Sequence, residues 1–163
     1  MIQDMLVKLY DLPDYSALRR EMDKLGITIR RPMAAEKSIV MEWTTKRFGD
    51  GWASELEVSF SYQPISCFIA IYKDEIVGFS VYDAAYRNFF GPTGVDESMR
   101  GKGIGKILLF EALEAMKSQG YAYAIIGGVG PAKFYEKAVG AKLIEGSDPG
   151  IYKGLMSYIP IDH

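Results

Sequence analysis

The spacing of apolar residues alternates between helical and strand-like periods along the chain. Helical spacing predicts helices over residues 14–25, 34–48, 52–59, 104–119 and 131–139. Alternating or continuous short apolar runs predict strands over residues 27–31, 67–72, 76–82, 88–95, 121–126, 142–145 and 151–155. Helices and strands therefore follow one another along most of the sequence.

The order of these elements predicts the architecture. Residues 67–72 and 76–82 are separated by a short polar turn and form a hairpin pattern. Residues 88–95, 104–119 and 121–126 form a strand-helix-strand crossover. We therefore expect an α/β (α+β) fold, with a mixed β-sheet and helices on both faces. Residues 1–26 are interpreted as an N-terminal helical extension, and residues 27–163 as a single domain.

The strand predicted over residues 88–95 is irregular. It contains Gly91, Pro92 and Gly94, and proline cannot donate a backbone hydrogen bond to a neighbouring strand. We expect a bulge or a missing ladder bond there rather than regular pairing.

A cluster of glycines and basic residues directly precedes the longest predicted helix. It comprises Arg100, Gly101, Lys102, Gly103, Gly105 and Lys106. Glycines let a ligand approach the backbone, and the following helix directs unpaired N–H groups and the positive end of its dipole at that ligand. The cluster predicts a phosphate-binding loop.

Two common phosphate-binding motifs do not fit this loop. A Walker motif needs glycine where Arg100 stands and serine or threonine where Ile107 stands. The dinucleotide motif needs a third glycine at Lys106 or Leu108 and an acidic residue after the next strand, which residues 121–126 do not supply. A nucleoside triphosphatase and a Rossmann cofactor site are therefore disfavoured.

Composition narrows the class of protein further. The formal net charge of −2 argues against nucleic acid as the main partner. The single cysteine, Cys67, lies in an apolar run and is interpreted as a buried thiol in a reducing compartment. The single histidine, His163, is the last residue, so we expect no metal site. No apolar stretch reaches membrane-spanning length, and we expect a cytoplasmic monomer or homodimer without a membrane partner.

Two motifs together resemble the GNAT superfamily of acyl-CoA-dependent N-acetyltransferases. Residues 95–105 are similar to the family's cofactor motif, in which a strand-ending valine precedes a glycine-rich turn into a helix. Residues 134–137, Phe-Tyr-Glu-Lys, are similar to the family's Tyr-Glu-Lys segment on the helix after the next strand. The resemblance implies a GNAT-like sheet that is splayed at its centre, with acetyl-CoA as the acyl donor.

The resemblance also implies roles for individual residues. Pantetheine would pair with the backbone in the gap beside Val95, the loop would hold the coenzyme A pyrophosphate, and an N–H near Val95 would stabilise the oxyanion. Tyr135 would be the catalytic acid that protonates the departing thiolate. The implied cofactor-binding residues are Val95, Arg100, Gly101, Lys102, Gly103, Ile104, Gly105 and Lys106. The implied reaction is direct attack of a primary amine of a small molecule on the thioester.

The acceptor site is expected between the first two family helices, where Trp52 and Glu55 offer an aromatic surface and a carboxylate. An alternative interpretation is a capped helix start with a core tryptophan. Asp148 and residues 149–152 are expected to line the same cleft. The positions that could supply a general base are Asp50, Glu55, Glu57 and Asp83.

The sequence departs from the family pattern in three places. Glu97 replaces a common proline, Gly128 replaces a common asparagine, and residues 137–141 replace the usual Lys-x-Gly-Phe ending with one extra residue. Two alternative functions stay open at this point. One is a non-catalytic acyl-CoA-binding module, and the other is a binder of phosphate ligands unrelated to coenzyme A.

Overall fold

The computed structural model describes residues 2–156, so the predicted domain end and His163 lie outside the described residues. The helices are α1 (Ser16–Leu25), α2 (Lys37–Phe48), α3 (Asp50–Ser59), α4 (Ile104–Ser118) and α5 (Ala132–Val139). The strands are β1 (Met5–Lys8), β2 (Ile27–Arg30), β3 (Cys67–Tyr72), β4 (Glu75–Tyr82), β5 (Phe89–Val95), β6 (Tyr123–Ile126) and β7 (Lys142–Leu143). No helix within this range is long and apolar enough to cross a membrane.

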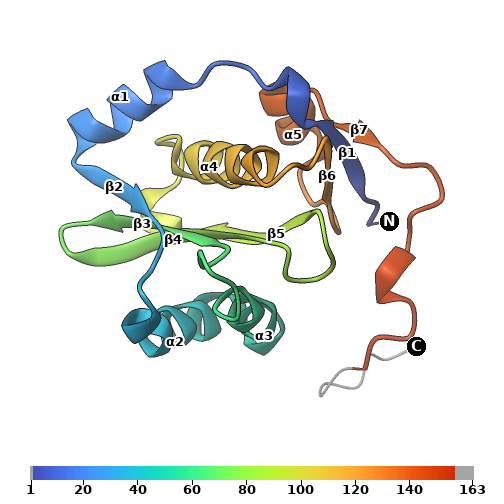
Figure 1. The fold of residues 1–163 in the computed structure, drawn as a ribbon. Coiled ribbons are helices and arrows are strands. Elements are labelled where there is room, and N and C mark those ends of the chain that lie inside the picture. Colours follow the sequence, from blue (N-terminus) through green and yellow to red (C-terminus); the bar gives the residue numbers. More distant parts are fainter. Residues whose placement is uncertain (1, 157–163) are drawn as a thin grey trace.

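The strands form one mixed sheet in the order β2-β3-β4-β5-β6-β1-β7. Strands β5 and β6 are parallel, and the other neighbouring pairs are antiparallel. Figure 1 shows α1, α4 and α5 on one face of the sheet and α2 and α3 on the other. The predicted fold class, a mixed sheet with helices on both faces, is confirmed.

The N-terminal segment is more than the helical extension predicted for residues 1–26. Helix α1 forms there, but Met5–Lys8 also forms a strand that lies between β6 and β7. Met5 pairs with Ile126 and with Leu143, both more than a hundred residues away in sequence. The side chains of Met5 and Val7 are fully buried, as expected for alternate residues of a strand. Strand β1 therefore belongs to the central sheet.

The prediction of a strand over residues 151–155 is wrong. A short 3-10 turn, Gly150–Tyr152, forms instead. Gly150 and Gly154 have φ values of 58° and 76°, in the left-handed region that an extended strand does not use. The preceding strand is also shorter than predicted, since β7 covers only Lys142–Leu143.

Two hydrophobic layers hold the sheet between its helices. Helix α4 packs on one face through fully buried residues such as Leu108 and Leu113. On the other face Val40 of α2 and Leu56 of α3 pack against Phe79 of β4. The two layers cover opposite faces of the middle strands. They fix the positions of α3, α4 and α5 relative to β5.

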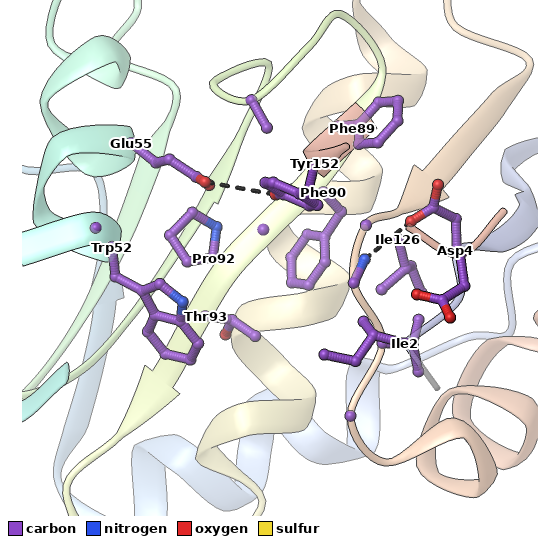
Figure 2. A pocket seen from close by; sticks show the side chains of 18 of the residues that line it. Ile2, Asp4, Trp52, Glu55, Phe89, Phe90, Pro92, Thr93, Ile126 and Tyr152 are labelled. Carbon is purple, nitrogen blue, oxygen red and sulfur yellow. Dashed lines mark hydrogen bonds between the residues drawn. The ribbon is translucent and has the colours of Figure 1, made fainter. Parts of the chain in front are cut away.

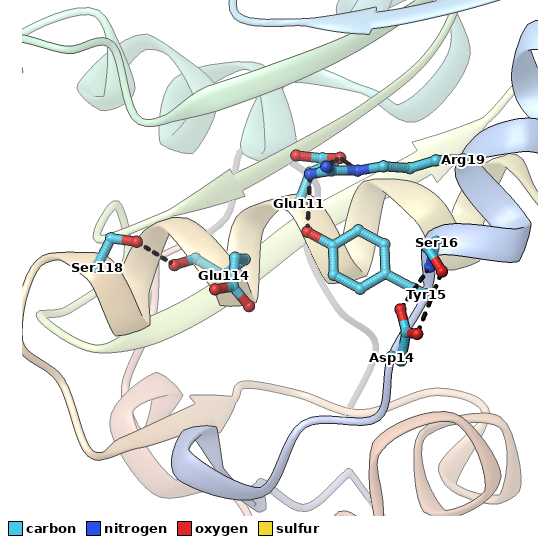
Figure 3. A network of polar contacts seen from close by, with 7 residues as sticks. All are labelled: Asp14, Tyr15, Ser16, Arg19, Glu111, Glu114 and Ser118. Carbon is cyan, nitrogen blue, oxygen red and sulfur yellow. Dashed lines mark hydrogen bonds and ion pairs between the residues drawn. The ribbon is translucent and has the colours of Figure 1, made fainter.

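Helix α1 packs against α4 through an aromatic contact and an ion pair, and Figure 3 shows the ion pair. The rings of Tyr15 and Phe110 are stacked with their centroids 4.8 Å apart. The guanidinium of Arg19 lies 2.8 Å from the carboxylate of Glu111. This packing sets α1 beside the start of α4, where the Leu18 side chain closely approaches Gly103.

The sheet opens between β5 and β6. Their ladder consists of only two residue pairs, Phe89 with Ile125 and Phe90 with Ile126. Beyond this point residues 93–95 of β5 pair only with β4. The interruption of strand pairing predicted for residues 88–95 is therefore observed. It leaves a gap in the sheet at the end of β6.

Candidate active site

The loop between β5 and α4 presents a row of unused backbone N–H groups. Gly101 and Gly103 have φ values of 80° and 89°, which glycine adopts without strain. Within residues 2–156, none of the N–H groups of residues 101–106 donates to a backbone or side-chain acceptor. Since α4 begins at Ile104, its positive dipole end lies at the same place. The loop has the properties of an anion site.

The basic residues of this loop have no acidic partner among residues 2–156. The Arg100 guanidinium donates to the Val95 carbonyl oxygen over 3.3 Å. Lys102 and Lys106 are exposed, and no carboxylate within the described residues pairs with either of them or with Arg100. The Ile104 side chain is buried in the core, so only its N–H can face a ligand. Three cations therefore remain available around the N–H groups.

A cavity of about 560 Å³ occupies the gap between β5 and the segment after β6. It is lined by β5, by residues 126–131, by α3, by residues 148–155 and by the N-terminal residues 2 and 4. Figure 2 shows residues from these distant segments meeting around it. Val95 and the glycine loop are not part of its lining. The structure thus has a loop with the properties of an anion site at the end of β5 and a cavity along the same strand.

Tyr135 lies on α5 and contributes to the cavity wall. Its side chain is 6% exposed, and its ring packs edge-on against Phe90 of β5 with centroids 6.5 Å apart. Burial raises the pKa of the phenol to about 12, so it stays protonated at neutral pH. Helix α5 ends at Val139 with Gly140 in the left-handed conformation, and the extra residue in this ending leaves Tyr135 facing the cavity.

Trp52 and Glu55 of α3 line the cavity from the opposite face of the sheet. The Trp52 ring stacks on Phe48 with centroids 5.1 Å apart. The Glu55 carboxylate is half-buried and accepts a hydrogen bond from the Tyr152 hydroxyl over 3.4 Å. Burial raises the pKa of Glu55, and the bond from Tyr152 opposes this shift. Tyr152 comes from the C-terminal segment that was expected to line the cleft.

The other acidic positions considered as general bases lie outside the cavity lining. Glu57 forms an ion pair with Lys37 over 3.0 Å. Asp83 accepts hydrogen bonds from the Asn88 N–H and from the Tyr121 hydroxyl. Asp50 is exposed at the start of α3. Of the four positions, Glu55 alone has its carboxylate at the cavity.

Asp4 is a cavity residue that the sequence analysis missed. Its carboxylate accepts a hydrogen bond from the Gly128 N–H over 2.9 Å. A Cβ at residue 128 would lie 3.5 Å from Ile2 and 3.7 Å from Tyr152, which are ordinary contact distances, and Gly128 has a φ of 58° in the left-handed region. No local pattern marks Asp4, because its place depends on the pairing of β1 with β6.

Gly94 allows the Phe48 ring to lie directly on β5 beside the cavity. A Cβ at residue 94 would lie 2.5 Å from the Phe48 Cζ atom, which is too close for any side chain. We expect Gly94→Ala to lower the free energy of unfolding by about 1–3 kcal/mol, the usual cost of overpacking. Equilibrium denaturation measures this change.

Gly51→Ala is the matched control, because a Cβ there meets nothing within 4 Å. Alanine inside a helix should raise the free energy of unfolding by about 0.5–1 kcal/mol. If Gly94→Ala unfolds like the parent protein, Phe48 does not depend on Gly94 for its position.

Comparison with protein families gives a match over most of the chain. Residues 35–141 match the family model described as the acetyltransferase (GNAT) family. Comparison with curated proteins gives no match.

Several solved structures share the fold. A GCN5-related glucosamine N-acetyltransferase region of a fungal multi-domain β-N-acetylglucosaminidase is 16% identical, with a TM-score of 0.72 over 88% of this chain and 20% of that chain. A GCN5-related N-acetyltransferase from Sphaerobacter thermophilus is 20% identical, with a TM-score of 0.67 over 88% of this chain and 48% of that chain. Another from Kribbella flavida is 17% identical, with a TM-score of 0.58 over 87% of this chain and 54% of that chain. This chain matches about half or less of each of their lengths.

Proposed function

This chain belongs to the acetyltransferase (GNAT) family, and we propose that it transfers the acetyl group of acetyl-CoA to a primary amine of a small molecule. As a member of this family, the protein is an acyltransferase that uses acetyl-CoA as the donor. The observation that carries the proposal for the acceptor is the cavity in the gap of the sheet, which has Tyr135 on one side and Glu55 on the other.

The donor is expected at the glycine loop and along β5. The unused N–H groups of residues 101–106 suit the coenzyme A pyrophosphate, and the basic side chains of the loop add attraction. The part of β5 that has no partner in β6 leaves backbone groups for the pantetheine arm. This arrangement directs the thioester from the loop toward the cavity.

The amine is expected to enter on the α3 side, where Trp52 and Glu55 lie. Glu55 accepts a proton from the ammonium, and the nitrogen lone pair then attacks the carbonyl carbon of the thioester. Negative charge develops on the carbonyl oxygen, where a backbone N–H near Val95 donates to it. The C–S bond breaks, its electron pair stays on sulfur, and the Tyr135 hydroxyl protonates the thiolate. The phenolate recovers a proton from the acylated nitrogen or from solvent.

Thiol release from acetyl-CoA tests this proposal across a panel of small amines. We expect release that depends on the amine and rises with its concentration. A non-catalytic acyl-CoA-binding module would bind acetyl-CoA and release no thiol above background. A general phosphate-ligand binder would be stabilised by ATP or NAD and not by acetyl-CoA in a thermal-shift comparison.

Replacing Glu55 by glutamine should lower kcat with a charged amine by about 10²–10⁴-fold, the usual contribution of a general base. The base works in its ionised form, so the rate of the parent protein should rise with pH through the raised pKa of Glu55. The variant should recover activity at high pH, as more of the amine becomes neutral in solution. The pH profile of kcat for both proteins measures this.

Glu57→Gln is the matched control, since it removes a carboxylate from the same helix but outside the cavity. Its pH profile should match that of the parent protein. A constant ratio between the parent and Glu55→Gln at all pH values would assign Glu55 to binding and not to proton transfer.

A further inference from the structure

The cavity is lined by acidic groups without any basic group. Asp4, Glu55 and Asp148 all contribute to its wall, and no lysine, arginine or histidine among the described residues does. The three carboxylates come from the N-terminus, from α3 and from the C-terminal segment. A cavity lined by charges of one sign raises the local concentration of ligands of the opposite sign. It therefore favours a cationic ligand.

Asp4 is the most buried of these three residues, and no basic side chain among the described residues pairs with it. The residue is only 8% exposed. Its Oδ1 atom accepts from the Gly128 N–H, and no donor within residues 2–156 reaches its Oδ2 atom. The Oδ2 atom is thus left to accept a hydrogen bond from a ligand in the cavity.

The backbone holds Asp4 firmly in this place. Its N–H donates to the Ser147 hydroxyl over 2.8 Å, and its carbonyl oxygen accepts from the Ile144 N–H over 2.9 Å. The next residue, Met5, begins β1 within the sheet. The carboxylate is therefore positioned in advance and does not need to move to meet a ligand.

Asp4 and Glu55 lie on opposite sides of the Tyr152 ring (Figure 2). The Tyr152 hydroxyl donates to Glu55, and burial together with the charges of Glu55 and Asp4 raises the pKa of Tyr152 to about 12. The lining between the two carboxylates includes apolar side chains such as Phe90 and Ile126. Two anionic points separated by an apolar surface match a ligand with two positive ends and a hydrocarbon middle.

We infer that the acceptor is a short diamine, or another amine with a second positively charged group, and that Asp4 binds this second group. The inference rests on the proposed function, in which the reacting nitrogen lies at Glu55. Asp4 acts here as a specificity-determining residue, and it takes no part in the transfer of protons or of the acetyl group.

Steady-state kinetics with matched acceptors test the inference. Straight-chain diamines are compared with monoamines of the same length, and glucosamine serves as an acceptor that carries hydroxyl groups in place of a second charge. We expect the best diamine to have a kcat/KM at least about tenfold above that of its matched monoamine, equivalent to about 1.4 kcal/mol. Monoamines or glucosamine that match the diamines would overturn the inference and leave the proposed function standing.

The Asp4→Asn variant tests whether the preference for diamines depends on the Asp4 carboxylate or on the overall negative charge of the protein. Asparagine keeps an oxygen for the Gly128 N–H and removes the negative charge. We expect the ratio of kcat/KM for diamines to kcat/KM for matched monoamines to fall by about tenfold or more. Asp23→Asn, at an exposed position of α1 outside the cavity, should retain the preference for diamines. A preference that persists in Asp4→Asn would overturn the assignment of Asp4.

Measuring diamine binding in the absence of turnover distinguishes the proposed acetyl transfer from the proposed binding of diamines at Asp4. In the absence of acetyl-CoA, diamines should raise the Tm of the parent protein and should have little effect on Asp4→Asn. Diamine binding that depends on Asp4, together with no thiol release from acetyl-CoA, would support the inference about the cavity and contradict acetyl transfer. The inference would be contradicted if the Tm of the parent protein stayed unchanged at a diamine concentration that saturates turnover.

Discussion

Replacing Tyr135 by phenylalanine should lower kcat by about 10²–10⁴-fold while acetyl-CoA binds as before. The phenol is buried, and burial raises its pKa to about 12, so it carries a proton at neutral pH. With this pKa the phenol is a weaker acid than a thiol, whose pKa is about 8.5, so the transfer is uphill and the phenolate regains a proton readily. Phenylalanine keeps the ring contact with Phe90 and removes only the hydroxyl. Steady-state kinetics and calorimetric titration with acetyl-CoA measure the two effects.

The cost in stability should be small, since the Tyr135 hydroxyl has no hydrogen-bond partner within the described residues. Tyr123→Phe is the matched control, because Tyr123 is 44% exposed and does not line the cavity. It should have the activity of the parent protein. A Tyr135→Phe variant with undiminished kcat would remove this residue from the role of acid.

Replacing Gly101 by alanine should weaken acetyl-CoA binding by about tenfold or more, because the left-handed conformation costs an L-residue about 1–2 kcal/mol. Gly101 has a φ of 80°, and its Cβ would meet no atom within 4 Å. The effect of the substitution is therefore on the backbone alone. To escape the strain the loop must turn, and the N–H groups of residues 101–106 then lose their common direction. Calorimetric titration with acetyl-CoA measures the change in Kd.

Gly120→Ala controls for the general cost of such a change. Gly120 also has a positive φ, 104°, with open space around its Cβ, but it follows α4 at the end far from the loop. Both variants should lose similar stability, and only Gly101→Ala should lose affinity for acetyl-CoA. Equal Kd values in the two variants would argue against a pyrophosphate at this loop.

The parts of the fold that depend on local signals could be predicted from the sequence. The glycines at residues 91 and 94 and the proline between them indicated irregular pairing, and β5 does leave β6 after two residue pairs. The apolar pattern of residues 104–119 predicted α4 to within one residue. Each of these signals acts through the conformation or burial of neighbouring residues, so a single sequence carries it.

The parts that depend on distant contacts were missed. Strand β1 has only four residues, and its partners β6 and β7 lie more than a hundred residues away in sequence. Asp4 reaches the cavity only because of that pairing. Residues 151–155 have the composition of a strand, but they join no sheet among the described residues, and left-handed glycines at residues 150 and 154 turn the chain. Trp52 and Glu55 were identified from the family pattern, and their relation to Asp4 needed the structure.

In the proposed reaction the acetyl group passes directly from acetyl-CoA to an amine in the cavity between β5 and β6. Isotopically labelled acetyl-CoA tests it, with the label followed on the protein and on a diamine acceptor in a single turnover. We predict that the label moves to the diamine at the rate of thiol release and that the protein alone acquires none. Label retained by the protein without an amine, or thiol release that does not depend on the diamine, would contradict direct transfer.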